Sequence, residues 1–187
     1  LGLVHEIIPM SDDSVKTVLL TDEGELSMQR YFVDRRAEPK VSEVRYTGAE
    51  VAEASPGLRD ALDRATALVL CPSNPYLSLG PILAIPTIRQ AMRDFSGKRI
   101  CVSPIVGGDA VKGPAGKIMT ELGKEVSCVE IAREYQDICD VLVIDRRDRN
   151  LATQIEEMGI TPLVTSTIME TEEDKIALAR EIVELME

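Results

Sequence analysis

Ala67-Leu68-Val69-Leu70-Cys71 runs directly into Pro72-Ser73-Asn74-Pro75, and Arg99-Ile100-Cys101-Val102-Ser103 runs in the same way into Pro104-Ile105-Val106-Gly107-Gly108. Each stretch opens with a short apolar run, which is typical of a strand buried on both faces. Each then breaks into small and polar residues. In open parallel sheets, ligands bind outside the carboxyl ends of the strands, where such loops meet. We therefore expect these two loops to carry the function.

From residue 57 onward, apolar runs alternate with segments of helical periodicity. Strand, helix, strand, helix in this order predicts a parallel sheet with right-handed crossovers. The fold class is therefore α/β, with a Rossmann-like three-layer parallel sheet and helices on both faces over residues 57–187. The predicted strands lie at 67–71, 99–103, 141–144 and 161–165, and the predicted helices begin near Pro56, Pro86, Pro114, Cys128, Leu151 and Thr171.

Residues 1–56 follow a different pattern, with strands and little helix. Apolar and alternating residues predict strands at 3–9, 16–21 and 41–47, with a short helix around 27–35. This pattern is typical of a small α+β region or insert. We expect the nucleotide-binding core to occupy residues 57–187.

Composition narrows the class of protein. The chain has 187 residues and a net charge of −11, which argues against a general nucleic-acid surface because duplex binding needs a basic face. No apolar run approaches the ~20 residues of a membrane span, so no membrane partner is expected. The four cysteines lack metal-binding spacing and sit in apolar segments, which indicates buried, reduced thiols and a cytoplasmic location.

A phosphate-binding loop is one interpretation of residues 112–117. Gly113 suits the turn before a helix, and the free N–H groups of a helix start attract anions. Lys112 and Lys117 flank this start and add positive charge. Gly107 and Gly108 let the backbone approach a ligand closely. The alternative is a glycine-rich turn with solvated lysines.

The second candidate loop begins at Ser73. Asn74 offers one acceptor and two donors, and Ser73 and Ser78 offer both kinds of group. Pro75 stiffens the loop, so the donors are positioned before a ligand arrives. The alternative is that these side chains only satisfy their own loop backbone.

Carboxylates follow two predicted strands. Asp12 and Asp13 follow the first, and Asp145 follows the strand 141–144, so each is a candidate ligand for Mg²⁺, although most such residues form turns. No serine, cysteine or histidine is paired with a base, so transfer at phosphorus, which needs no protein nucleophile, is the favoured chemistry.

The sequence resembles the CofD family of 2-phospho-L-lactate transferases. The resemblance rests on Cys71-Pro72-Ser73-Asn74-Pro75, on Ser78 with Gly80-Pro81-Ile82-Leu83, on Ser103-Pro104-Ile105-Val106-Gly107-Gly108, and on Lys112-Gly113-Pro114-Ala115. Pro9-Met10-Ser11-Asp12-Asp13 and Val143-Ile144-Asp145 also fit. The resemblance covers essentially the whole chain.

The resemblance implies a transferase of coenzyme F420 biosynthesis. Such enzymes move a phospholactyl or phosphoenolpyruvyl group from a guanosine diphospho-donor to the deazaflavin Fo, release GMP and need Mg²⁺. The resemblance implies two groups of residues against the donor: Ser73, Asn74, Ser78 and Gly80 at the nucleotide, and Gly107, Gly108, Lys112 and Gly113 along its phosphates. It does not assign which loop takes the base and which the phosphates. Pro75, Ser103 and Lys117 are further candidate binding residues.

The sequence departs from this family at its amino end. The glycine-rich segment that follows the first strand of family members is absent, so the chain resembles their carboxyl-terminal portion. We therefore expect weak nucleotide binding and little or no transfer by this chain. The alternatives are a non-catalytic nucleotide-binding regulator of related α/β fold and an interaction domain that forms a homo-oligomer.

Overall fold

A computed structural model describes residues 5–186. The strands are β1 (Lys16–Thr21), β2 (Gly24–Ser27), β3 (Val41–Thr47), β4 (Ala67–Leu70), β5 (Lys98–Val102), β6 (Ile105–Val106), β7 (Asp109–Ala110), β8 (Val141–Asp145) and β9 (Thr161–Thr165). The α-helices are α1 (Pro56–Arg64), α2 (Gly80–Leu83), α3 (Pro86–Arg93), α4 (Ala115–Glu121), α5 (Cys128–Tyr135), α6 (Ala152–Glu156) and α7 (Glu172–Glu184). Two π-helical turns, Arg30–Asp34 and Pro75–Leu79, and a 3₁₀ segment, Arg146–Leu151, complete the chain.

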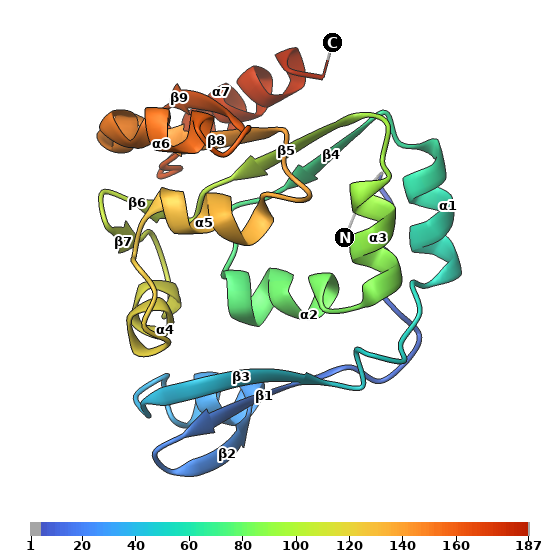
Figure 1. The fold of residues 1–187 in the computed structure, drawn as a ribbon, viewed down its shortest axis with the longest axis vertical. Coiled ribbons are helices and arrows are strands. Elements are labelled where there is room, and N and C mark those ends of the chain that lie inside the picture. The colour runs from blue at the N-terminus through green and yellow to red at the C-terminus, as the bar shows by residue number, and fades with distance from the viewer. Residues whose placement is uncertain (1–4, 187) are drawn as a thin grey trace.

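A four-stranded parallel sheet forms the centre of the molecule, in the order β4-β5-β8-β9 (Figure 1). The chain adds each strand on the same side of the previous one. Right-handed crossovers then place all the connecting helices on one face of the sheet. The core agrees, because side chains of α3, α4, α5 and α6 share one apolar cluster with Leu70, Cys101 and Leu142.

The opposite face of the sheet packs against α7. Leu178 of α7 is buried against Ile100, Val102, Val141 and Val143, which alternate in sequence with the residues of the first face. The sheet therefore has helices on both faces, which confirms the predicted three-layer α/β fold. Thr171 caps α7 by accepting a hydrogen bond from the Asp174 N–H, while the Asp174 carboxylate accepts one from Thr171 in return.

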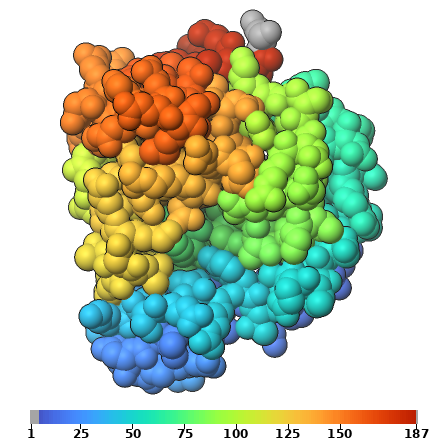
Figure 2. All heavy atoms as spheres, viewed as in Figure 1, coloured from blue at the N-terminus to red at the C-terminus, as the bar shows by residue number. Residues whose placement is uncertain are grey.

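A three-stranded antiparallel sheet, β2-β1-β3, lies across α2 and α4 from the parallel sheet (Figure 1). Its inner side chains, among them Leu19, Leu26 and Val41, belong to the same apolar cluster as the core helices. In the space-filling view this sheet (blue to cyan) forms the end of the molecule next to the yellow α4 region (Figure 2). It is packed onto the core.

Three polar contacts join the antiparallel sheet to the core. The Lys117 ammonium donates to the Pro39 carbonyl at 2.7 Å. The Val41 N–H donates to the Glu121 carboxylate at 2.9 Å. The Tyr46 hydroxyl donates to the Tyr76 carbonyl at 2.8 Å. The last of these contacts borders a cavity that is described below.

Three expectations about local structure are wrong. Residues 5–9, the described part of the predicted strand 3–9, form no strand, and residues 3–4 lie outside the described residues. The predicted loop from Ser73 to Gly80 is helical from Pro75, because Asn74 caps that turn and proline suits its first position. Cys71 is exposed at the end of the edge strand β4, although Cys101, Cys128 and Cys139 are buried as expected. No helix within residues 5–186 is both long and apolar enough to cross a bilayer.

Candidate functional site

Two cavities lie beyond the carboxyl ends of the parallel strands. One, of about 150 Å³, is lined by residues that follow β4, β5 and β9, including Ser73, Ser103 and Thr167. The other, of about 400 Å³, lies between these loops and the antiparallel sheet. Asn74 and Lys112 line both. The two loops singled out in the sequence therefore lie side by side at one rim of the parallel sheet.

The carbonyl oxygen of the Asn74 side chain is used within its own loop, and its amide nitrogen is not. Its carbonyl oxygen accepts hydrogen bonds from the N–H groups of Tyr76 and Leu77, at 2.9 and 3.0 Å. The amide nitrogen is buried and has no hydrogen-bond partner among residues 5–186. An unpaired buried donor costs about 1–3 kcal/mol. A ligand that accepts a hydrogen bond from this nitrogen removes that cost.

Lys112 is the charged residue of both cavities. It is exposed, and its ammonium forms neither an ion pair nor a hydrogen bond with any part of the described chain. No other residue lining the two cavities within this part of the chain is charged. The positive charge of Lys112 is therefore uncompensated, which makes the site suited to an anion although the whole chain is acidic.

The antiparallel sheet supplies an apolar wall. Met28, just after β2, and Phe32, in the first π-helical turn, line the 400 Å³ cavity opposite Asn74 and Lys112. The Phe32 side chain is 48% exposed, which is high for an aromatic residue. An exposed phenylalanine facing a lysine offers a surface for the apolar part of an anionic ligand. This wall was not predicted from the sequence, because its residues lie about 40 positions before the central loops.

The serines of the site differ in whether their hydroxyl groups already make hydrogen bonds within the chain. Ser103 is buried, and its hydroxyl donates to the Ile105 carbonyl and accepts from the Ile105 N–H, so it is used by its own turn. Ser73 lines the smaller cavity and Ser78 the larger one. Thr167, which follows β9, also lines the smaller cavity. Its position after a parallel strand is the signal from which it could have been found.

Two glycines of the second loop form a backbone turn and do not line the cavities. Gly107 and Gly108 have φ angles of +61° and +81° and form the two-residue turn between β6 and β7. The Gly107 N–H donates to both oxygens of the buried Asp148 carboxylate at 3.0 Å. Neither glycine lines the two cavities. Gly113, with φ of +72°, lines the larger one.

Three other expected ligand contacts lie elsewhere. Lys117 is occupied by the Pro39 carbonyl and by an ion pair of 2.7 Å with Glu121. Pro75 and Gly80 line a third cavity. A Cβ at Gly80 would come within 1.9 Å of the Tyr46 hydroxyl, so glycine is required there for packing.

The candidate metal ligands are not brought together. Both oxygens of the Asp145 carboxylate accept hydrogen bonds, from the N–H groups of Arg147 and Thr167. Asp13 accepts from the Glu53 N–H at 2.9 Å, and Asp12 is exposed. Within residues 5–186 no three acidic, histidine or cysteine side chains form a group that could hold a metal ion. These residues do not fit a Mg²⁺ site, and we assign the ion no ligand in this chain.

Buried thiols offer no nucleophile. Burial raises the pKa of Cys128 to about 12. A hydrogen bond with Cys139 and burial raise the pKa of Cys101 as well. Both thiols are therefore protonated at neutral pH, and the protonated form is a poor nucleophile.

Comparison with known proteins gives a consistent family. The family model described as 2-phospho-L-lactate transferase CofD matches residues 1–182. A 2-phospho-L-lactate transferase of Methanopyrus kandleri is 41% identical, with all of this chain and 59% of that protein aligned. Proteins of the same name from Methanococcoides burtonii and Methanocaldococcus jannaschii are each 38% identical over 98% of this chain. The chain spans about 60% of the length of these relatives.

Solved structures support the fold. Two crystal structures of a UPF0052-family protein from Bacillus halodurans superpose with TM-scores of 0.58 and 0.61 at 14% identity. They cover 91% and 94% of this chain, and this chain covers 59% and 60% of theirs. At this identity the likeness shows the fold alone. The family model over residues 1–182 and the identities of 38–41% show that the chain belongs to the CofD family of 2-phospho-L-lactate transferases.

Proposed function

We propose that the cavities shared by Asn74 and Lys112 bind the diphosphate of a guanosine diphospho-donor. In this proposal a phospholactyl-type group passes from the donor to the primary hydroxyl of the deazaflavin Fo, in coenzyme F420 biosynthesis. The observation that carries the proposal is Lys112, an uncompensated cation in the lining of both cavities. The names of the curated relatives supply the reaction class.

The chemistry of the lining suits a phosphorylated ligand. The Lys112 ammonium donates charge-assisted hydrogen bonds to phosphate oxygens, and such bonds are about twice as strong as neutral ones. The buried Asn74 amide nitrogen adds a neutral donor at the same wall. The hydroxyls of Ser73 and Ser78 add further donors from the same loop.

The proposed transfer is a displacement at phosphorus. The acceptor hydroxyl oxygen attacks the phosphorus that bears the lactyl group. The bond from this phosphorus to the bridging oxygen breaks, GMP leaves with that oxygen, and the hydroxyl proton is released. Reactions of this kind depend mainly on positioning and charge stabilisation. Lys112 supplies charge stabilisation in this scheme.

Nucleotide binding without transfer is the second candidate function. The lining of the two cavities contains no carboxylate or imidazole within residues 5–186, so this part of the chain offers no base for the acceptor proton. This observation favours binding of the donor with little turnover by this part of the chain.

Calorimetry with GDP tests the proposal. Lys112→Ala is expected to weaken GDP binding about 10- to 100-fold, because a charge-assisted hydrogen bond contributes about 1.5–3 kcal/mol. Asn74→Asp keeps the oxygen that caps the turn but replaces the free donor by a buried charged acceptor, so we expect a similar loss of GDP binding together with a lower melting temperature. Lys175→Ala, on the surface of α7, is the matched control and should bind GDP normally.

Two outcomes separate the alternatives. Equal GDP affinity for wild type, Lys112→Ala and Asn74→Asp excludes the proposed site. GMP release from a guanosine diphospho-lactate donor in the presence of Fo distinguishes transfer from binding. GDP binding without GMP release identifies the chain as a nucleotide-binding unit.

A further inference from the structure

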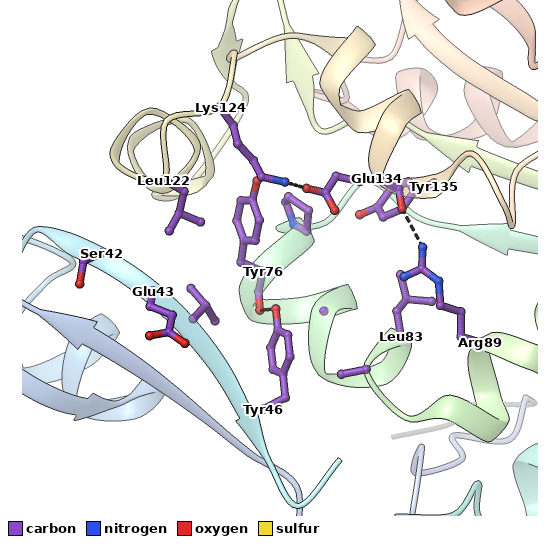
Figure 3. A pocket seen from close by; sticks show the side chains of 14 residues that line it. Ser42, Glu43, Tyr46, Tyr76, Leu83, Arg89, Leu122, Lys124, Glu134 and Tyr135 are labelled. Carbon is purple, nitrogen blue, oxygen red and sulfur yellow. Dashed lines mark hydrogen bonds and ion pairs between the residues drawn. The ribbon is translucent and has the colours of Figure 1, made fainter. Parts of the chain in front are cut away.

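A cavity of about 420 Å³ lies between β3 and the helices α2 and α5 (Figure 3). It is lined by Pro75, Tyr76 and Gly80, whereas Asn74, Leu77 and Ser78 of the same segment line the proposed donor site. Three of the four tyrosines of the chain, Tyr46, Tyr76 and Tyr135, line it. Its volume is within the range of small-molecule sites. It takes no part in the function proposed above.

The charges around this cavity neutralise one another. Lys124 pairs with Glu134 and, at 3.5 Å, with Glu130. Arg89 pairs with Asp137 at 2.6 Å and donates to a backbone carbonyl. Both cations are thus engaged, in contrast to Lys112. A charged ligand would have to break one of these pairs, so the cavity favours an uncharged one.

The unpaired groups at the cavity are two phenol hydroxyls. Tyr76 is 7% exposed and Tyr135 is 2% exposed, and neither hydroxyl has a partner anywhere in the described chain. Burial raises the pKa of both, and that of Tyr46 to about 12, so all three are protonated. Tyr46 already donates to the Tyr76 carbonyl. Tyr76 and Tyr135 therefore have O–H donors that lack an acceptor.

Most of the remaining lining is apolar, although Ser42 and Glu43 of β3 also border the cavity, and Glu43 pairs with Arg45 at 2.8 Å. Val44, Leu83, Ala84 and Leu122 face the cavity together with Pro75. An occupant with an apolar body and oxygen acceptors at one edge matches these walls. Water alone satisfies hydroxyls but leaves the apolar walls hydrated.

We infer that this tyrosine-lined cavity is a second ligand site, for a compact uncharged ring compound whose carbonyl oxygens accept from Tyr76 and Tyr135. Lys124 lies beside Tyr76, and its ammonium is 5.8 Å from the centre of that ring.

The test uses 1,3-dimethyluracil, an uncharged ring with two carbonyl acceptors and no N–H donor. Titration into the ¹⁵N-labelled chain should shift amide signals of β3 and of residues 122–124. Tyr135→Phe should bind the probe about tenfold more weakly, and the Tyr76→Phe/Tyr135→Phe double variant at least tenfold more weakly again. Orotate, the carboxylate-bearing counterpart, should not bind there.

Stability separates a ligand site from a structural role. Removing an unpartnered hydroxyl should leave the melting temperature of ligand-free Tyr135→Phe unchanged or higher, because no internal hydrogen bond is lost. Lys112→Ala should bind the probe as wild type does, which separates this site from the donor site. Absence of binding, equal binding by the tyrosine variants, or loss of binding in Lys112→Ala would each overturn the inference.

Discussion

The strand-end cavities and the tyrosine-lined cavity are lined by residues of the same short segment, 74–80, yet they differ in charge. In the first, Lys112 is exposed and unpaired within the described residues. In the second, Lys124 and Arg89 are each held by carboxylates. Whether a lysine or arginine can bind an anionic ligand therefore depends on the carboxylates that surround it in the fold, and not on its residue type.

The largest effect is expected from Gly80→Ala, on the tyrosine side. The new Cβ would lie 1.9 Å from the Tyr46 hydroxyl and 2.8 Å from the Pro75 carbonyl oxygen. Tyr46 must move and give up its hydrogen bond to Tyr76, so we expect the free energy of unfolding to fall by about 3 kcal/mol. Urea denaturation measures this loss.

The exposed Ser78→Ala is the control for Gly80→Ala, and it should change the free energy of unfolding by less than about 0.5 kcal/mol. If Gly80→Ala also lowers the free energy of unfolding by less than about 0.5 kcal/mol, the packing between Gly80 and Tyr46 is looser than the distances indicate.

The next largest effect contrasts the two lysines. Lys124→Ala leaves the largely buried Glu130 and the partly buried Glu134 without their cation, so we expect a loss of about 1.5 kcal/mol in stability and unchanged GDP binding. Lys112→Ala should do the reverse, weakening GDP binding without a loss of stability. Thermal unfolding measures the stability of both variants, and calorimetry measures their GDP affinity. Equal changes in stability and in GDP affinity for the two variants would contradict the contrast between the two lysines.

A pH-dependent effect is expected at Asp137. The hydrogen bond from Arg89, with help from Arg93, lowers the pKa of Asp137 to about 2. Because the folded pKa lies below the usual value near 3.8, this group stabilises the fold above that value, and the contribution is lost as pH falls toward 2. After allowance for solvent screening, Asp137→Asn should cost about 1 kcal/mol at pH 7.

Denaturation at pH 7, 5, 4 and 3 measures the Asp137 effect. The difference between wild type and Asp137→Asn should be constant from pH 7 to 5 and shrink below pH 4. A difference that does not depend on pH would mean that the aspartate acts by packing and not by charge.

The smallest effect concerns salt. Raising sodium chloride from 50 to 500 mM should weaken GDP binding about threefold, because the exposed charge of Lys112 is screened. Binding of 1,3-dimethyluracil should not change, because that ligand carries no charge. Calorimetry or NMR titration at both salt concentrations measures this, and equal salt dependence would contradict the contrast in charge.

Local sequence was sufficient for most elements of the core. The predicted strand 141–144 agrees with β8 to within one residue, and the strand 161–165 agrees with β9. Apolar runs and caps act over a few residues, so they can be read without the fold. The helical segment 75–83 was missed because Pro75 was interpreted only as stiffening a loop. Asn74 followed by proline was in fact its start signal.

Part of the candidate site was also predictable. Parallel strands end at one rim, so the loops of Asn74 and Lys112 were expected to be neighbours, and they line the same cavities. Met28 and Phe32 could not be predicted as the facing wall, because the antiparallel sheet reaches the rim only through contacts between distant segments.

The α/β core, its strands along the chain and the likeness to the CofD family follow from the sequence alone, because they depend on local apolar patterns and on short motifs. Which charges are available to a ligand depends on the folded arrangement. Lys112 and Lys117 are five residues apart and looked equivalent, yet Lys117 reaches Pro39 and Glu121 while Lys112 lines the cavities. Ion pairing depends on what distant segments bring within reach of a side chain, and that is set by the fold.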